Sequence, residues 1–508
     1  MGHRAVANGA PLIMPRPALW KDDPDCGHEV ACEFQTHYCT YIRVPRLLTL
    51  QRPRADHPAE TLAILALQAC ELWFAVLISD LRAALADLAA GETQTHEPAK
   101  LLRRCSSLIK LLDHQTDVAG SILARDAGFR IALRTSAGSA LSPQFAELAL
   151  LTRRLKKRLK DEGEGMNPPA SLSLQPFVEA GNEYLSRFSA WRPRYLRLLK
   201  ETIAPAGPRS RAPAYADFVA LPELLSLQNG VKADWSPKGE PPTAIAPAEC
   251  VSPDELMFIV VHQAFELWFK AILGELDSVI GLLTVATADV LTATRRLGRV
   301  VKIQKLLVEQ IHIPATMLPL DFLRFRGETK VVDGVTNVRG LSPSSGTESY
   351  QFREIEIVAG LKGDAAHAEF LQGSPRLDIR LLTPAQKRRL AQPSLPEAFK
   401  HLLERRGVKD VVEIFTAADR HNPHADLAEL ADVLLEFDEF FRLWRVHHAT
   451  MVQTMIGEKS GTGFLGPEYL RETAGMGLQG KGRVFPTPQV RPRFFESLWA
   501  ARTRLGRY

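Results

Sequence analysis

The sequence predicts an all-α protein composed of two related helical bundles. Residues Leu62–Leu88 and Glu255–Leu283 are long apolar stretches without proline, and their length favours helices over strands. The seven residues Gln68–Phe74 recur as Gln263–Phe269 with a single substitution, which indicates an internal repeat. Segments with the alternating pattern of a strand are sparse.

The other predicted helices follow in chain order. Leu101–Leu123 and Ala293–Ile311 continue the helical pattern in the two halves. Leu427–Met455 is a further long helix, and its apolar residues recur at steps of three and four, which places them on one face. This face comprises Leu430, Leu434, Phe437, Phe441, Trp444, His448 and Met451.

The repeat extends beyond one helix. Lys110–Leu112 matches Lys305–Leu307 at the same offset of 195 residues, and Tyr38–Ile42 resembles Tyr215–Val219. Because the matches keep the same order, we predict a tandem duplication. It comprises an N-terminal extension (1–37), a first copy (38–203), a linker (204–214) and a second copy (215–508).

The composition excludes several classes of protein. The 508 residues carry 63 Lys and Arg against 58 Asp and Glu, a net charge of +5 without a basic tract, so we expect no nucleic-acid partner. The most apolar stretches contain charged residues and fall short of the ~20 residues that span a bilayer, so we expect no membrane. None of the six cysteines forms a CxxC pair, and we expect a cytoplasmic protein with reduced thiols.

Two histidines interrupt apolar helices and are candidates for chemistry. A single buried histidine is more often a core residue than a ligand, but the repeat supplies a comparison. The counterparts of His262 and His448 in the first copy are Leu67 and Tyr195. The paired loss suggests that only the second copy keeps a site, and a neutral imidazole on a rigid helix suits an axial haem ligand.

Other histidines compete for the ligand role. His447 points about 100° away from the face that His448 shares with Trp444, so we prefer His448. His421 and His424 could suggest a metal site, but the proline between them predicts a turn, and no carboxylate or cysteine pattern completes the site.

Arg326 and Thr462 are candidates for binding a carboxylate. Arg326 ends the stretch Asp321–Arg326, in which aromatic residues flank it, and arginine binds carboxylates with two parallel hydrogen bonds. The alternative is an ordinary salt bridge at a helix end. Thr462 lies between two glycines and could donate to the same carboxylate, although such loops are common.

The second copy resembles the tryptophan 2,3-dioxygenase family of haem enzymes over nearly its whole length. Several motifs match in order and spacing. They are Tyr215–Phe218, Phe258–Lys270, Met317–Arg326, Ser345-Gly346 with Gln351–Arg353, Trp444–His448, Gly461–Gly463 and Phe495–Trp499.

This resemblance implies a role for each matching residue. His448 matches the proximal ligand of haem b and its iron, and His262 matches the distal histidine that binds the indole N–H. Phe258 matches the aromatic residue that packs on the indole. Arg326 matches the arginine that binds the substrate carboxylate, and Thr462 matches the threonine that assists this arginine. The implied reaction inserts both atoms of O2 across the indole C2–C3 bond of L-tryptophan, giving N-formylkynurenine.

We assign Trp444, Ser345 and Gly346 to cofactor binding on the same resemblance. Phe322 lines the expected substrate pocket, where the family usually has a tyrosine. In the family, residues near the N-terminus of one subunit enter the pocket of its neighbour, and these match Tyr38, Tyr41 and Ile42. We therefore expect an intramolecular pseudo-dimer in which a haem-free first copy completes the site of the second. Two chains could also form a homodimer.

Three functions follow from these expectations. The first is a dioxygenase of L-tryptophan, and the second is a haem oxygenase of a substituted tryptophan or another aromatic amino acid in a biosynthetic pathway. The third is a haem-binding sensor or scaffold without catalysis. The joint presence of His262, Arg326 and Thr462 argues against the third, because a sensor needs no site for an amino-acid carboxylate.

Overall fold

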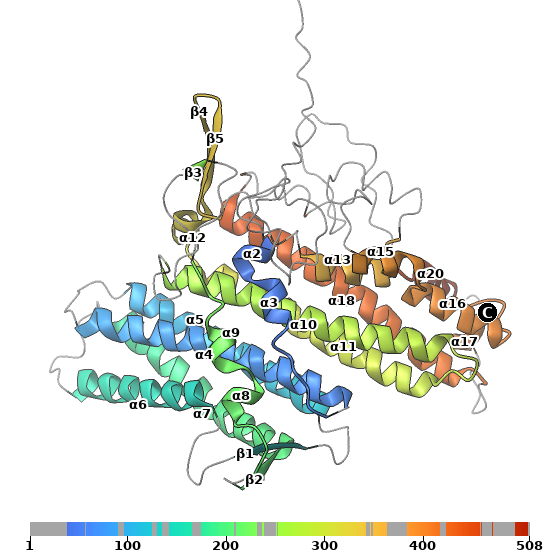
Figure 1. Ribbon diagram of the computed structural model, residues 1–508, viewed down its shortest axis with the longest axis horizontal. Helices are drawn as coiled ribbons and strands as arrows, with labels where there is room; N and C mark the ends of the chain where they lie inside the picture. Colours follow the sequence, from blue (N-terminus) through green and yellow to red (C-terminus); the bar gives the residue numbers. More distant parts are fainter. Residues whose placement is uncertain are drawn as a thin grey trace, which may run out of the picture.

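The structure is a computed structural model, and helices dominate it, which confirms the all-α prediction (Figure 1). It describes residues 38–505 except 56, 90–95, 124–129, 135–141, 165–173, 208–209, 231–235, 238–249, 251, 342–345, 347–348, 363–383, 417–422, 458, 460–469 and 471–492. We refer to residues 38–203 as the N-terminal half and to residues 215–508 as the C-terminal half.

The N-terminal half begins with two short helices and continues with four long ones. They are α2 (Tyr38–Ile42), α3 (Val44–Leu48), α4 (Pro58–Ala89), α5 (His96–Leu123), α6 (Pro143–Glu164) and α7 (Gln175–Thr202).

The C-terminal half also begins with two short helices, and its three longest helices lie side by side (Figure 1). Those three are α10 (Pro253–Thr284), α11 (Val290–Gln310) and α18 (Ala425–Ile456). The shorter elements are α8 (Tyr215–Phe218), α9 (Leu221–Leu225), the 3-10 helix η2 (Pro314–Thr316), α12 (Pro319–Arg326), α13 (Tyr350–Val358), α15 (Pro384–Ala391), α16 (Leu395–Arg405), α17 (Glu413–Thr416) and α20 (Glu496–Arg504).

Local sequence explains where the main helix of the C-terminal half begins. The Ser252 side chain accepts a hydrogen bond from the Glu255 amide at the start of α10. Pro253 occupies the first turn, where its missing N–H is not needed, and Asp254 and Glu255 place negative charge at the positive end of the helix dipole. The helix therefore starts four residues before Met257, and its register positions the residues of the site.

The chain makes the same unusual turn in both halves. Arg43 between α2 and α3 has φ 59°, and Ala220 between α8 and α9 has φ 49°. Residues other than glycine rarely adopt this left-handed conformation. The turn is followed by proline within the first turn of the next helix in both cases, so the two pairs of short helices have matching local geometry.

Reciprocal hydrogen bonds join the two halves. Gln68 Nε2 in α4 donates to the carbonyl of Val219 at 3.0 Å, and Gln263 Nε2 in α10 donates to the carbonyl of Ile42 at 3.0 Å. Both glutamines are fully buried. Since a buried amide without partners is costly, these bonds hold the short helices of each half against the long helix of the other.

Two small sheets complete the fold. β1 (Ile131–Arg134) pairs in parallel with β2 (Ile203–Ala206), so part of the expected linker forms a strand. β4 (Glu328–Val332) and β5 (Val335–Arg339) form a hairpin that projects from the helices, with the short β3 (Ser236–Pro237) along β5 (Figure 1). The hairpin turns at Asp333 and Gly334, both at positive φ, as a tight two-residue turn requires.

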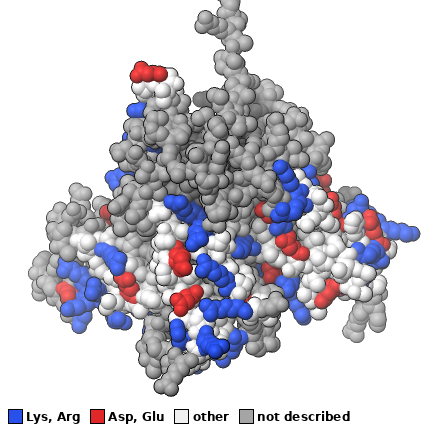
Figure 2. Space-filling model, in the orientation of Figure 1, with Lys and Arg blue, Asp and Glu red and all other residues white. Residues whose placement is uncertain are grey.

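In the part of the chain that the structure describes, two helices are long and apolar enough to cross a membrane, Ala59–Ala86 and Pro253–Thr284. However, 89% and 78% of their most apolar windows are buried inside the protein, which is typical of core helices. On the face in Figure 2, blue basic and red acidic side chains are mixed over the described residues, as the small net charge predicts.

Candidate functional site

The first functional candidate, His262, lies in the third turn of α10. Its Nδ1 is 2.7 Å from the carbonyl oxygen of Phe258. Because a carbonyl can only accept, Nδ1 carries the proton, and burial lowers the pKa of the imidazole to about 4. His262 is therefore neutral at pH 7, and its Nε2 has a lone pair that can accept a hydrogen bond.

Aromatic side chains surround His262 on one side. The ring of Phe258 lies 4.4 Å from the imidazole, centroid to centroid. Phe322 and Phe325 of α12 pack on Phe258 at 5.5 and 5.4 Å. This arrangement creates an apolar wall next to a single hydrogen-bond acceptor, which suits a flat aromatic ligand with one N–H group.

Tyr38 approaches His262 from the N-terminal half. Its ring lies edge-on at 5.9 Å from the imidazole centroid, and its hydroxyl donates to Glu266 Oε1 at 2.9 Å. Gln351 Nε2 donates to the other carboxylate oxygen of Glu266 at 2.7 Å. Burial raises the pKa of Glu266, and the hydrogen bonds from Gln351, Ser349 and Tyr38 oppose this effect.

Tyr41 and Ile42 are also buried between the halves. Burial, followed by the nearby Glu255 and Cys250, raises the pKa of Tyr41 well above its usual value. Tyr41 therefore lies near the first turn of α10, one turn before Phe258. The Tyr41 hydroxyl is buried and has no hydrogen-bond partner among the described residues. Ile42 contributes its carbonyl to the interhelical contact with Gln263.

Arg326 is the last residue of α12, where the hairpin begins. At the base of this hairpin Gly327 and Gly340 cross so closely that a Cβ on Gly327 would lie 1.8 Å from the carbonyl oxygen of Arg339. The amide of Leu341 donates to the carbonyl of Phe325 at 3.0 Å. These contacts return the chain toward the site directly after the hairpin.

Gly346 lies against His262 on the returning chain. A Cβ placed on Gly346 would be 3.4 Å from Nε2 and 3.5 Å from Cδ2 of the imidazole. Glycine at this position therefore keeps the space in front of the Nε2 lone pair open. Ser345 and Thr462, the other loop residues predicted for the site, lie outside the described residues.

His448 lies on α18 and belongs to the same region as His262. Burial, followed by the proximity of His262, lowers the pKa of His448 to about 4. The indole of Trp444, one turn earlier, lies 5.1 Å from the His448 ring. The neighbouring His447 points elsewhere and contacts His312, with 2.9 Å between Nδ1 and Nε2, as the helical-face argument predicts.

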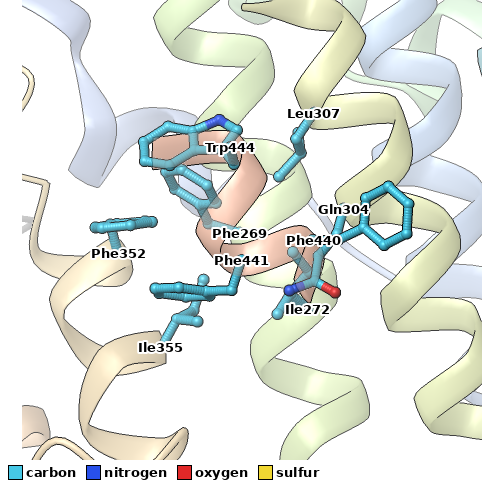
Figure 3. A pocket seen from close by; sticks show the side chains of 9 residues that line it. All are labelled: Phe269, Ile272, Gln304, Leu307, Phe352, Ile355, Phe440, Phe441 and Trp444. Atoms are coloured by element: carbon cyan, nitrogen blue, oxygen red, sulfur yellow. The ribbon is translucent and has the colours of Figure 1, made fainter. Parts of the chain in front are cut away.

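A small apolar cavity lies beside Trp444. Figure 3 shows Trp444, Phe269 and Phe352 gathered at one side of it, and Phe352 is 4.8 Å from Trp444. The lining residues come from α10, α11, α13 and α18 and are Phe269, Ile272, Gln304, Leu307, Phe352, Ile355, Phe440, Phe441 and Trp444. Apart from Gln304, the lining of this cavity is entirely aromatic and aliphatic.

The equivalent region of the N-terminal half is filled. Tyr195, the counterpart of His448, is fully buried and stacks on Trp191 at 5.2 Å. It also packs against Phe74 at 5.6 Å and Phe145 at 5.1 Å. Leu67, the counterpart of His262, is an ordinary core residue. This half therefore has neither histidine in its helical core.

One further difference separates the halves at these tryptophans. Trp191 Nε1 donates to Thr116 Oγ1 at 3.1 Å, whereas Trp444 Nε1 is buried without a hydrogen-bond partner among the described residues. The position equivalent to Thr116 is Ile311. A neutral imidazole in an apolar setting fits a planar, mostly apolar group such as haem, and the buried Trp444 N–H could donate to a polar atom at the edge of such a group.

A metal held by protein side chains alone has less support. The described residues include no group of three or more His, Cys, Asp or Glu that could hold a metal ion. Reasoning from single motifs missed Glu266 and Phe325, although the repeated Glu of the Gln68–Phe74 and Gln263–Phe269 motifs was a visible signal.

Comparison with known proteins agrees with this geometry. A family model described as tryptophan 2,3-dioxygenase matches residues 209–392. The tryptophan 2,3-dioxygenase of Herpetosiphon aurantiacus is 33% identical over 317 residues, which cover 58% of this chain and 100% of the relative. Those of a Nocardioides species and Caulobacter vibrioides are 35% and 31% identical, covering 51% and 57% of this chain and 87% and 98% of the relatives.

The chain belongs to the tryptophan 2,3-dioxygenase family. It is therefore an oxidoreductase of the dioxygenase type, which excludes the non-catalytic sensor considered from the sequence. The whole Herpetosiphon relative aligns with a little over half of this chain. This member of the tryptophan 2,3-dioxygenase family is accordingly much longer than the relatives it matches.

Proposed function

We propose that this protein is a haem-dependent dioxygenase that converts L-tryptophan and O2 to N-formylkynurenine. Both oxygen atoms are inserted across the indole C2–C3 bond, which breaks. The observation that carries the proposal is the neutral His262, with its lone pair on Nε2, beside Phe258 and in the same region as a second neutral histidine, His448.

The residues of the C-terminal half would hold the cofactor. His448 would ligate the haem iron, with Trp444 and Gly346 beside the ring. When bound, haem supplies the binding and activation of O2. The chain's own task is then to hold the amino acid in one orientation and to exclude water.

Three contacts would orient the substrate. The indole ring packs on Phe258, and the indole N–H donates to Nε2 of His262. Nε2 can accept because the proton of the imidazole is on Nδ1, which donates it to the Phe258 carbonyl. Arg326 at the end of α12 would pair with the carboxylate, assisted by Thr462. Tyr38, held by Glu266, would close the pocket from the N-terminal half.

We also propose that the chain is a tandem duplication that forms an intramolecular pseudo-dimer with one haem per chain. The matched turns at Arg43 and Ala220 and the reciprocal bonds of Gln68 and Gln263 support it. The packing of Tyr195 supports a haem-free N-terminal half, because its ring fills the equivalent space. The buried free thiols of Cys70 and Cys105 fit a reducing cytoplasm.

The test incubates ferrous, haem-loaded protein with O2 and L-tryptophan and follows N-formylkynurenine by its absorbance. We expect product and one haem per chain. His448→Ala should lose both haem and activity, whereas the matched variant His447→Ala should keep them, because His447 contacts His312 instead. Two haems per chain, or a His448→Ala variant that retains full haem, would contradict the proposal.

A second candidate is a haem oxygenase of a substituted tryptophan. The observation that favours it is Phe322, which packs on Phe258 and has no hydroxyl where the family usually has tyrosine. The same assay with ring-substituted tryptophans decides between the two. Faster turnover of a substituted substrate than of L-tryptophan would move this candidate to first place.

A further inference from the structure

A buried chain of ion pairs links the N-terminal half to the proposed substrate site. The Arg104 guanidinium binds both carboxylate oxygens of Asp80 at 2.6 and 2.7 Å and also pairs with Asp254 at the start of α10. Lys100 Nζ, one turn earlier on α5, contacts Asp254 at 3.2 Å and Asp321 at 2.7 Å. The side chains of Arg104 and Asp80 are fully buried, and those of Lys100 and Asp321 are 12% exposed.

The last carboxylate of this chain belongs to α12. Asp321 is in the first turn of this eight-residue helix, and Arg326 is its last residue. Between them, Phe322 and Phe325 pack on Phe258. A short helix has little stability of its own, so its external contacts decide where it lies. Lys100 and the aromatic packing are contacts on this helix from two different halves of the chain.

Among the described residues, the bridge has no full equivalent built on the C-terminal half. The Asp80–Arg104 pair corresponds, 195 residues later, to Glu275 and Arg299, which approach to 3.6 Å. The residue equivalent to the acid at the start of α10 is Ala59, which has no carboxylate. Among the described residues, therefore, only the ion pair of the N-terminal half extends to the helix beside His262.

Two cations of the bridge, Arg104 and Lys100, face three carboxylates, those of Asp80, Asp254 and Asp321. Desolvation opposes ionisation of Asp254, but the charge and hydrogen bond of Arg104, followed by those of Lys100, hold its pKa below the usual value. Buried ion pairs contribute little net stability and are better explained by the geometry they impose. Here the imposed geometry is the position of α12 relative to α5 and α10.

We propose that Lys100, supported by Arg104, is a positioning residue for the amino-acid substrate: it anchors α12 through Asp321 and thereby holds Arg326 where it meets the carboxylate. The inference rests on the proposed function, because it assumes the contact between Arg326 and the substrate carboxylate. The N-terminal half then contributes to substrate selection through an ion-pair bridge in addition to Tyr38.

The test compares haem-loaded full-length variants. Lys100→Met keeps the length of the side chain and removes its charge, and Asp321→Asn keeps the shape of the carboxylate. We expect each to raise the KM for L-tryptophan roughly tenfold with little change in kcat, as for mutations that couple to a site without touching the ligand. The inhibition constant of tryptamine, which has the indole but no carboxylate, should change less than about twofold.

Two further variants make the test decisive. Arg299→Met removes the equivalent cation of the C-terminal half, where Glu275 keeps its contact with Arg296 at 3.4 Å, and should leave both constants unchanged. Combining Lys100→Met with Arg326→Met should raise KM no further than Arg326→Met alone, because both act through one contact.

The possible contrary results have distinct meanings. Equal rises of the KM for L-tryptophan and of the inhibition constant of tryptamine would overturn the positioning role of Lys100, and so would additive effects on KM in the double variant. Both results would leave the proposed function intact. An unchanged KM in Arg326→Met would overturn the proposed carboxylate contact, and this inference with it.

Discussion

Tyr38→Phe removes a single hydroxyl and tests whether the N-terminal half completes the site. The hydroxyl donates to the buried carboxylate of Glu266 at 2.9 Å, while the ring lies edge-on to His262. The protein contains its own control. Tyr215 of the C-terminal half donates to Glu71 at 2.7 Å, so Tyr215→Phe removes the same bond beside the half that has Leu67 and Tyr195 in place of His262 and His448.

The expected loss of stability is similar for the two variants. A hydrogen bond to a charged group contributes about 1.5–3 kcal/mol. With an unfolding entropy of about 2 cal/mol/K per residue, the 508 residues correspond to roughly 1 kcal/mol/K. If the halves unfold together, each variant should therefore lower the Tm by about 1–3 °C.

The effect on activity should differ. Without its bond to Glu266, the ring of Tyr38 loses the contact that orients it against His262. We expect kcat/KM for L-tryptophan to fall by up to about tenfold in Tyr38→Phe, because small displacements near a bound substrate are costly. Tyr215→Phe should stay within about twofold of the unaltered protein.

Thermal unfolding and steady-state kinetics on both variants complete the measurement. Equal losses of kcat/KM in the two variants would show that the effect is a general consequence of stability. A Tyr38→Phe variant with full activity and a lowered Tm would show that Tyr38 is structural only, and either result refutes the reasoning.

Three more predictions follow from the same contacts. Gly346→Ala places a methyl group 3.4 Å from Nε2 of His262, in the space that the indole N–H would occupy. We therefore expect kcat/KM to fall roughly tenfold with the Tm unchanged. Unaltered kinetics would disprove this prediction. The pKa of His262 is lowered to about 4 by burial, so the unfolded chain binds more protons between about pH 6.5 and pH 4, and stability should fall as the pH falls through that window. His262→Leu reproduces Leu67 of the other half. In this variant the difference in urea midpoint between pH 7 and pH 5 should be smaller than in the unaltered protein. The same difference in both proteins would count against a role of His262 in the pH dependence. Lys270 Nζ donates to the carbonyl of Leu48 at 2.7 Å, so Lys270→Met should cost about 1–3 kcal/mol in urea unfolding, and no loss would indicate that the carbonyl finds another donor.

Much of the secondary structure could be predicted because it depends on local pattern. The predicted helix Glu255–Leu283 is α10, Pro253–Thr284, and the predicted Leu427–Met455 is α18, Ala425–Ile456. The preference for His448 over His447 also followed from helical periodicity alone. The hairpin of β4 and β5 was not predicted, since each of its strands has only five residues.

The sequence by itself determined the class of fold, the family and the two histidines, since helical periodicity and motif spacing are properties of the linear chain. Only the tertiary structure decided which nitrogen of His262 is free to accept, because that depends on the Phe258 carbonyl. It also decided that Tyr195 fills its half and that Lys100 reaches Asp321. The contacts of Tyr195 with Phe74 and of Lys100 with Asp321 join side chains far apart in sequence, and their geometry depends on how the long helices pack, which no local pattern encodes.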